Sequence, residues 1–531
     1  MSKRLASVIF VVLASCIFLV ACYCLVLFLA PGFSAFGVKY IRSNVHLFHT
    51  GACKISDTKA FSSTGFSGNI IVETNEVPVN IIYTEGQEYY FDYYDNYQGF
   101  TTSKFDDPSF SITRDAAGNA VIKTTEFKKF IYESSSSERY LNIYIPLASV
   151  CGDFAYGTNL SITTNTGTVT FTKEQLDDKR VATHGNLTIN NTSSKVVYEA
   201  NVHAVNFNQT TNNSIKMLVD QNKEVYATNY KLESKLGKIS VLESVVGDIS
   251  AKTESGDIQI VACKNFVAES NFGDISCVKK DEIIHVRGIV NIKTKAGAVE
   301  LGDVDGNGDN VIATGGGSVE INKIKDATIT TTRGSVKIKS LSNAKIETNI
   351  GKVTVNEALE SISVSTKRGN VVLGAEGLTV NNPTVFSRLG KVTLAAASGK
   401  VNIETVSSAV SFTNTSSQDI TITSGGKLSA SKLTGVITIN AKADTSLDFA
   451  KITNQTKIVL ADTCHNITIV ANNNTEKDTK FYFSGRNVIR YEDEAKVKEG
   501  NIIQSEGTVV TDAYISVEGK NAAISAYFKK P

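Results

Sequence analysis

Four side chains with oxygen ligands lie close together in one glycine-rich segment: Asp303, Asp305, Asn307 and Asp309. Oxygens at the first, third and fifth positions, followed by a glycine, are typical of a loop that wraps Ca²⁺. The helical EF-hand version is not expected, because its twelfth position is Thr314 rather than Glu. A metal-free polar turn between two strands favours the same residue types. The segment therefore predicts either a calcium site or a plain turn.

A second candidate site is the aromatic segment 89–97, which holds five tyrosines in nine residues. Side chains alternate between the two faces of a strand, so Phe91 would face one way and Tyr90 and Tyr94 the other. One face can pack in a core, and the other would expose tyrosines beside carboxylates, a surface suited to sugar or protein contacts. We predict Tyr90, Tyr94 and Tyr97 as ligand-binding residues, with ordinary sheet packing as the alternative.

Catalytic motifs are absent from the sequence. The six histidines are dispersed without metal-ligand spacing, and there is no GxSxG, Walker or Rossmann phrase. Asp248, Asp257 and Asp274 recur at one position of a repeated phrase and could line the face of a polysaccharide-active enzyme. Lysines such as Lys238 occupy the same position in other copies, which indicates a tolerant solvent position. We expect a non-catalytic protein without a cofactor, calcium excepted.

The composition indicates β structure. The chain has 38 glycines but only 6 prolines, so it turns often and keeps nearly all backbone donors. The 54 Lys and Arg nearly balance the 53 Asp and Glu, for a net charge of +1. This balance, with no polybasic run, predicts no nucleic-acid partner.

A short phrase recurs from about residue 230: glycine, any residue, Ile or Val, any residue, then an apolar residue. Three successive intervals, from Gly317 to Gly334, Gly351 and Gly369, measure 17, 17 and 18 residues. Ten copies begin at Gly237, Gly256, Gly297, Gly317, Gly334, Gly351, Gly369, Gly390, Gly399 and Gly435. A unit this small cannot bury its own apolar row, whereas stacked copies bury a continuous one.

These repeats predict an all-β fold, a parallel β-solenoid or β-helix with coils of about 17–20 residues. We place the solenoid at 151–475, an irregular β region at 66–150 and a C-terminal β cap at 476–531. The glycine of each phrase is expected where the coil turns sharply with left-handed backbone. A large sandwich or other β assembly is the alternative.

The N-terminus predicts a membrane anchor. Residues 5–30 contain no charged residue and are long enough for one transmembrane helix, with a short cytoplasmic end making up the rest of 1–32. A cleaved signal peptide and a lipoprotein signal at Cys16 or Cys22 are the alternatives. Residues 33–65 are expected to be a juxtamembrane linker. The predicted orientation has the N-terminus inside and the bulk of the chain on the extracytoplasmic side.

The early strands closed by residues 141–146 and the Gly-Asp-Ile phrases at Gly247, Gly256 and Gly273 carry a resemblance. In these motifs the chain resembles the putative-adhesin family, β-solenoid domains of unknown function on bacterial envelope proteins. The resemblance spans about residues 66–440. It implies a surface-exposed adhesion or interaction module that contacts a surface protein or glycan, and it transfers no catalytic residue. A β-helical carbohydrate-active enzyme and a structural or stress-sensing envelope protein are the alternatives.

Overall fold

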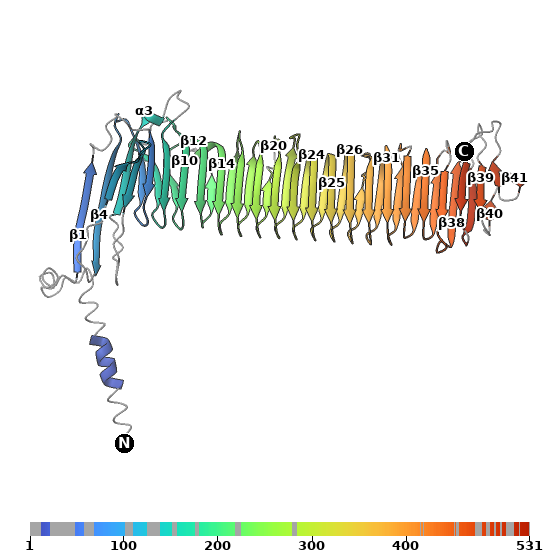
Figure 1. Ribbon diagram of the computed structural model, residues 1–531, viewed down its shortest axis with the longest axis horizontal. Helices are drawn as coiled ribbons and strands as arrows, with labels where there is room; N and C mark the ends of the chain where they lie inside the picture. Colours follow the sequence, from blue (N-terminus) through green and yellow to red (C-terminus); the bar gives the residue numbers. More distant parts are fainter. Residues whose placement is uncertain are drawn as a thin grey trace, which may run out of the picture. The chain divides into compact units, whose positions relative to one another are not determined.

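The computed structural model is built almost wholly of β-strands (Figure 1). It divides into two compact units: the first unit is Met1–Asn213 with Val219–Thr228, and the second unit is Ser214–Leu218 with Asn229–Pro531. The structure describes residues 12–21, 48–57, 68–100, 110–124, 139–150, 157–175, 180–217, 225–278, 284–414, 416–417, 419–450, 452, 456–472, 480–484, 489–492, 495–499, 502–505, 514–519 and 521–529.

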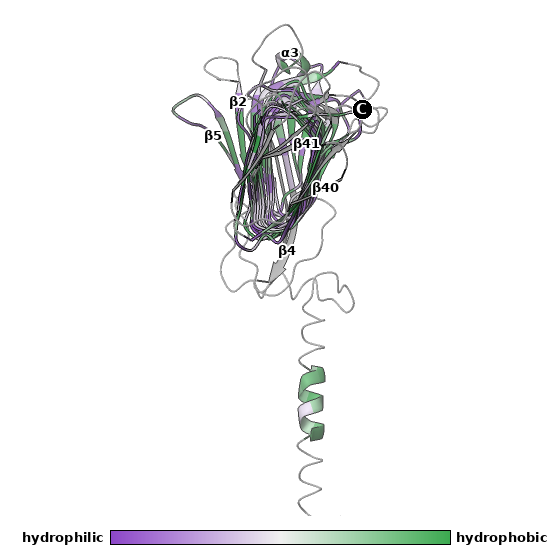
Figure 2. Cartoon of the chain, turned by 90° about the vertical axis from the view of Figure 1, so that its right-hand side faces the viewer, coloured by the Kyte–Doolittle hydropathy of each residue, from purple (hydrophilic) through white to green (hydrophobic). Residues whose placement is uncertain are grey.

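Residues 12–21 form a helix of exposed, mostly apolar side chains, drawn green in Figure 2. Within the described residues, no helix has the length and apolar character needed to cross a membrane. The rest of the predicted anchor at residues 5–30 lies outside them, so the anchor stays a prediction.

The first unit contains two sheets. One has the order β1 (Phe48–Asp57), β4 (Tyr90–Phe100), β7 (Arg139–Pro146), β3 (Val79–Thr84), β9 (Val169–Lys173) and β11 (Val196–Tyr198). The other joins β5 (Phe110–Arg114), β6 (Ala120–Thr124), β2 (Asn69–Glu73), β8 (Asn159–Thr164), β10 (Ala182–Asn191) and β12 (Val202–Thr211). A single helical turn, α3 (Leu147–Val150), follows β7. Pairings that involve β1, β4 and β5 are antiparallel, and the others are parallel. Because both kinds of pairing occur here, residues 66–150 lack the regular repeat of the later turns.

The predicted linker 33–65 contains a strand. β1 pairs antiparallel with β4 along ten residues, from Phe48↔Phe100 to Asp57↔Phe91. The sequence of β1, FHTGACKISD, has no strict apolar alternation, which is the signal by which a strand is normally predicted. Its pairing with β4 places it at the edge of the sheet, where a regular pattern is less necessary.

The second unit is a parallel β-solenoid, as predicted. Its strands form two rows, and each strand pairs in parallel with the equivalent strand of the next turn. One row contains β13 (Ile215–Met217), β15 (Ile239–Ser244), β17 (Ile258–Ala262), β19 (Ile275–Cys277), β22 (Val299–Val304), β24 (Val319–Thr331), β25 (Val336–Thr348), β26 (Val353–Thr366), β27 (Val371–Leu373), β30 (Val392–Ser398), β32 (Val410–Asn414), β34 (Leu428–Leu433), β36 (Thr445–Phe449) and β38 (Asn466–Asn472). The other begins with the part of β14 (Val225–Ser234) from Asn229 onward and continues with β16 (Ile249–Thr253), β18 (Phe266–Ser270), β21 (Val290–Thr294), β23 (Asn310–Thr314), the second halves of β24, β25 and β26, then β29 (Pro383–Ser387), β31 (Lys400–Thr405), β33 (Asp419–Ser424), β35 (Val436–Ala441) and β37 (Thr456–Leu460). Two short strands, β20 (Ile284–Val286) and β28 (Val380–Asn381), lie beside the first row.

The core of the second unit is a continuous column of branched apolar residues. Val319 pairs with Val336, which pairs with Val353, and each is at most 1% exposed. Partners 17 residues apart, such as Ile258 and Ile275, match the predicted coil length. The next step, from Ile275 to Val299, takes 24 residues, because the chain between these two positions also contains β20.

Most phrases open with a glycine because successive turns pack closely there. The prediction that these glycines adopt left-handed backbone was wrong. A Cβ on Gly351 would lie 1.8 Å from the carbonyl oxygen of Gly334 in the preceding turn. Positive φ occurs among the ten phrases only at Gly399 and Gly435. Three residues before each of these packed glycines stands a buried Thr or Ser; Thr348 Oγ1, for example, accepts a hydrogen bond of 3.1 Å from the Gly351 N–H. The turn motif is therefore Thr/Ser-x-x-Gly.

The C-terminal segment 476–531 covers the end of the stack. The order of its strands in the stack differs from their order in the sequence. Its strands are β39 (Lys480–Ser484), β40 (Ile489–Glu492), β41 (Ala495–Glu499), β42 (Ile502–Ser505), β43 (Tyr514–Glu518) and β44 (Ala523–Lys529). The last two, β43 and β44, pair directly with β37 and β38. The earlier β39 and β40 pair on the far side of β43 and β44, and β42 pairs antiparallel with both β39 and β41.

Candidate functional site

The aromatic strand β4 alternates as predicted. Phe91 and Tyr93 point into the first unit and are 0% and 1% exposed. Tyr90, Asp92 and Tyr94 lie on the other face and are partly exposed. One face of the strand therefore packs in the core, and the other is available for contacts.

Tyr90 and Tyr94 each stack on a tyrosine of the neighbouring strand β7. The Tyr90 and Tyr144 rings are 3.8 Å apart at an interplanar angle of 11°, and the Tyr94 and Tyr140 rings are 5.5 Å apart at 26°. Register places Asp92 opposite Asn142 between the two pairs. We call the surface formed by Tyr90, Tyr94, Tyr140, Tyr144, Asp92 and Asn142 the tyrosine face.

Polar groups continue from the tyrosine face across the sheet. Asn80 of β3 donates through Nδ2 to Asn142 Oδ1 at 2.9 Å. The Tyr90 hydroxyl donates to Glu174 Oε1 at 3.4 Å, just beyond β9. The surface thus combines flat aromatic rings with amide and carboxylate groups, the combination that recognises hydroxyl-rich or peptide ligands.

Burial raises the pKa of the Tyr90 phenol well above its ordinary value, and the neighbouring Tyr144 and Glu174 raise it further. Burial also raises the pKa of Tyr144. Both phenols therefore keep their protons at neutral pH, so they serve as hydrogen-bond donors and not as bases or nucleophiles. The third predicted residue, Tyr97, pairs through its backbone with Gly51, and its side chain lies outside the described residues.

A buried histidine lies in the core of the first unit. His184 Nε2 is 2.8 Å from the hydroxyl of Tyr83, and Nδ1 is 2.7 Å from the carbonyl oxygen of Thr158. The carbonyl can only accept, so the Nδ1–H donates to it and Nε2 accepts from Tyr83. Burial lowers the pKa of His184 to about 4. A neutral imidazole with both nitrogens bonded is a structural element here.

The predicted calcium segment begins inside a strand. Asp303 belongs to β22, is 8% exposed and accepts a hydrogen bond from Asn322 Nδ2. Asp305 Oδ1 lies 3.7 Å from Lys323 Nζ, whereas Asn307 and Asp309 are exposed. Among the residues that the structure describes, no three His, Cys, Asp or Glu side chains are grouped to hold a metal. Ca²⁺ binding by this segment stays a prediction.

The Asp row bridges successive turns. Asp257 Oδ1 accepts from the backbone N–H of Asp274 at 3.0 Å, and Asp274 Oδ1 accepts from Ala298 at 2.7 Å. Asp248 Oδ1 accepts from Asn265 Nδ2 at 2.8 Å. These carboxylates satisfy donors at the turns between strands, a structural use that explains their recurrence.

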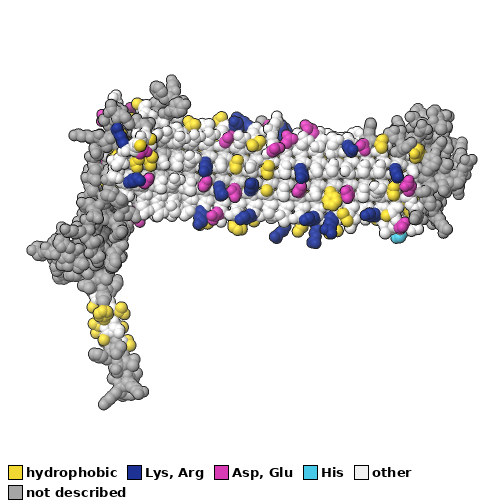
Figure 3. Space-filling view, in the orientation of Figure 1, with side chains coloured by type: hydrophobic (Ala, Val, Ile, Leu, Met, Phe, Trp, Pro, Cys, Tyr) yellow, Lys and Arg dark blue, Asp and Glu magenta, His cyan; other side chains and the backbone are white. Residues whose placement is uncertain are grey.

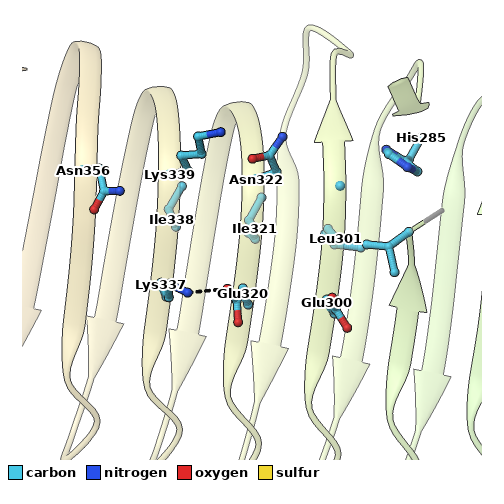
Figure 4. A pocket seen from close by; sticks show the side chains of 12 residues that line it. His285, Glu300, Leu301, Glu320, Ile321, Asn322, Lys337, Ile338, Lys339 and Asn356 are labelled. Atoms are coloured by element: carbon cyan, nitrogen blue, oxygen red, sulfur yellow. Dashed lines mark hydrogen bonds and ion pairs between the residues drawn. The ribbon is translucent and has the colours of Figure 1, made fainter. Parts of the chain in front are cut away.

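A hollow of about 470 Å³ lies on the outer face of the second unit, where the inserted segment precedes β22 (Figure 4). Glu300 and Glu320 are partners in the strand register, and Lys337 Nζ binds Glu320 Oε1 at 2.6 Å. His285 is 5% exposed, and its Nδ1 accepts from the Asp303 N–H at 3.2 Å. This histidine is buried and hydrogen-bonded, so the charged groups that the hollow offers are those of Glu300, Glu320 and the lysines beside them.

Comparison with known proteins supports the fold of the N-terminal half. The model of the family described as Toastrack DUF4097 matches residues 68–282. This range contains the tyrosine face and the first turns of the second unit. The match fits a β-solenoid domain of unknown function, and it does not establish adhesion. No curated protein and no solved structure gave a significant match.

Two tyrosines of the tyrosine face were not predicted from the sequence. Tyr140 and Tyr144 are four residues apart, the same spacing as Tyr90 and Tyr94. Equal spacing on two antiparallel strands lets both pairs stack at once. That shared spacing could have predicted the pairing of the tyrosines. It was missed because the two strands are far apart in the sequence.

Proposed function

We propose that the protein is a membrane-anchored, surface-exposed β-solenoid that acts as a non-catalytic adhesion or interaction module. The tyrosine face is its contact surface. The observation that carries this proposal is the pair of stacked tyrosine couples, Tyr90 with Tyr144 and Tyr94 with Tyr140, on the outward face of one sheet.

The geometry of the tyrosine face suits an extended ligand. Tyr90 and Tyr94 are four residues apart on one strand, which corresponds to about 14 Å at the rise of an antiparallel strand. Stacked rings lose little conformational freedom on binding, because their partners already hold them. The Asp92 and Asn142 groups between the ring pairs add hydrogen-bonding atoms. A short glycan or an extended peptide has this size and chemistry.

The anchoring part of the proposal rests on the N-terminal sequence. Residues 5–30 carry no charge, and the helix at 12–21 exposes apolar side chains such as Leu13, Ile17 and Phe18. Exposed apolar side chains on a helix are stable in lipid and unfavourable in water. With the N-terminus inside, both units lie on the extracytoplasmic side, where the tyrosine face meets its ligand.

Attachment of cells that express the full-length chain tests the contact surface. Tyr90→Ala with Tyr94→Ala should weaken attachment to a printed glycan array or to partner cells on the order of thirtyfold, since loss of a central aromatic contact costs about 2 kcal/mol. Tyr226→Ala removes a partly exposed tyrosine elsewhere in the first unit and is the control. Normal attachment by a folded Tyr90/Tyr94 variant would refute this contact surface.

Protease treatment of intact cells tests the location. Both units should be cleaved from the outside while a tag before Met1 remains protected. If the solenoid is cleaved only after the cells are lysed, it lies on the cytoplasmic side. That result would refute the proposed adhesive function.

A further inference from the structure

The Thr/Ser-x-x-Gly turns of the second unit form one edge of the stack, and the two middle residues of each turn are partly or fully exposed. Four consecutive turns lie at 331–334, 348–351, 366–369 and 387–390. Backbone hydrogen bonds join them in order: Ile350 N–H to Thr332 O at 3.2 Å, Arg368 to Asn349 at 2.8 Å, and Leu389 to Lys367 at 3.0 Å. Their exposed residues therefore form one continuous surface.

This surface is strongly basic. Figure 3 shows Lys and Arg side chains gathered along the lower edge of the solenoid, the edge that carries these turns. Six exposed cations lie in the four turns or directly after their glycines, and we call them the basic ridge: Arg333, Lys352, Lys367, Arg368, Arg388 and Lys391. A net charge of +1 for the whole chain conceals this local excess.

Apolar side chains project among these cations. Ile350 is 52% exposed, Leu389 is 53% exposed, and Phe386, on the strand leading into the last turn, is 37% exposed. The turns do not require apolar residues, because the same position is Arg333 or Arg368 in neighbouring turns. Exposed apolar groups inside a charged patch mark an interaction surface.

The cations of the basic ridge are not neutralised by carboxylates. In the part of the chain that the structure describes, no ion pair involves any of the six. The nearby Glu347 is paired with Lys345 at 2.8 Å. Two lysines away from these turns do have partners: Lys323 lies 3.7 Å from Asp305, and Lys400 lies 3.5 Å from Asp419. Among the described residues, the basic ridge therefore carries six cations without an ion pair close together on one edge.

We propose that the basic ridge docks the solenoid on an anionic lipid bilayer. Lys and Arg near such a surface are each attracted by about 1 kcal/mol, which corresponds to about fivefold in affinity. Ile350, Leu389 and Phe386 supply the apolar groups that enter the boundary between headgroups and acyl chains. A soluble polyanion would pair with the cations but would gain little from the aliphatic tips, so the composition favours lipid. This contact is separate from the tyrosine face and from the N-terminal segment.

Vesicle flotation tests the docking. The full-length chain is first held in phosphatidylcholine nanodiscs, which give residues 5–30 the same lipid environment in every arm. Vesicles of phosphatidylcholine with or without phosphatidylglycerol are then added. We expect binding only with phosphatidylglycerol, and about 25-fold weaker binding for Arg368→Gln with Arg388→Gln. Ile350→Ser with Leu389→Ser should weaken binding at fixed charge, and most clearly at high salt.

The matched control is Lys323→Gln with Lys400→Gln, which removes the same charge away from the ridge and should bind normally. Arg368→Lys with Arg388→Lys retains the charge and should also bind normally, which excludes a folding defect at these turns. Equal binding to both vesicle types, or equal losses in the ridge and control variants, would overturn the proposal. Unchanged binding by the serine variant together with displacement by polyphosphate would assign the ridge to a soluble polyanion instead.

Discussion

Acidification should destabilise the first unit through His184. This imidazole is buried, its Nδ1–H donates to the Thr158 carbonyl, and its pKa is about 4 against an ordinary value of 6.5. The unfolded chain therefore binds a proton between pH 6.5 and pH 4 that the folded chain does not bind. The histidine's contribution is fully present above pH 6.5 and is lost as the pH falls to 4.

The magnitude follows from the difference of about 2.5 pKa units. At 1.36 kcal/mol per unit, complete acidification removes on the order of 3 kcal/mol of folding free energy, and about 2 kcal/mol is already lost at pH 5. Such a loss is a sizeable fraction of the stability of an ordinary domain. It should appear first in β10 and in the strands that contact it.

Hydrogen exchange of peptides from β10, read by mass spectrometry at pH 7 and pH 5, measures the opening free energy locally. His184→Gln keeps a donor and an acceptor but does not titrate, so the variant should lose this part of the pH dependence. The difference between the two proteins isolates the histidine. Equal pH dependence in both, or a titration midpoint of His184 near 6.5 by carbon-13 NMR, would refute the reasoning.

Three further predictions concern the second unit. Ile338→Asp, at a site that is 0% exposed, should unfold nearby turns because an unpaired buried charge costs several kcal/mol, whereas Lys339→Asp on the solvent face should leave the thermal melt nearly unchanged. Gly351→Ala should lower the melting temperature, because its Cβ would lie 1.8 Å from a carbonyl oxygen, whereas Gly86→Ala, with no neighbour closer than 3.5 Å, should be close to neutral; equal melts would contradict the packing role of the turn glycines. Millimolar Ca²⁺ should raise the melting temperature, with binding seen by calorimetry, if the Asp303 segment holds the ion, whereas an unchanged melt would favour the plain turn, in which Asp303 keeps its hydrogen bond to Asn322.

The repeated phrase predicted the solenoid because stacking imposes the same requirement at every turn. Inward Val336 and outward Lys337 could be assigned from alternation alone, and the structure places them 1% exposed and on the solvent face. The reason for the glycines could not be seen, because the close approach of Gly351 to Gly334 depends on how tightly turns stack. The predicted face of β4 was correct, but the partners Tyr140 and Tyr144 come from a strand about fifty residues later, whose pairing no local pattern specifies.

The Asp303 segment shows what a local sequence pattern does not specify. Oxygen-rich side chains at alternate positions are typical of a metal loop, yet the first of them, Asp303, belongs to β22, which ends at Val304. Parallel pairing of β22 with β24 places Asp303 beside Asn322 of the next coil, where it accepts a hydrogen bond. Whether such a segment forms a metal loop or a hydrogen-bonded turn depends on the residues beside it in the following turn of the solenoid. The sequence of the segment does not specify those neighbours.

The stacking order at the C-terminal end constrains how the chain can assemble. Each turn from β13 to β38 can settle on its predecessor as soon as it is synthesised. The segment with β39 and β40 cannot, because its resting place is on top of β43 and β44, which are made later. Until residue 529 has emerged, the edges of β37 and β38 stay open, and an open parallel edge is a template for another chain. Synthesis of β43 and β44 thus covers these two edges, and a chain that terminates before them would be left with two unpaired parallel edges at the end of its stack.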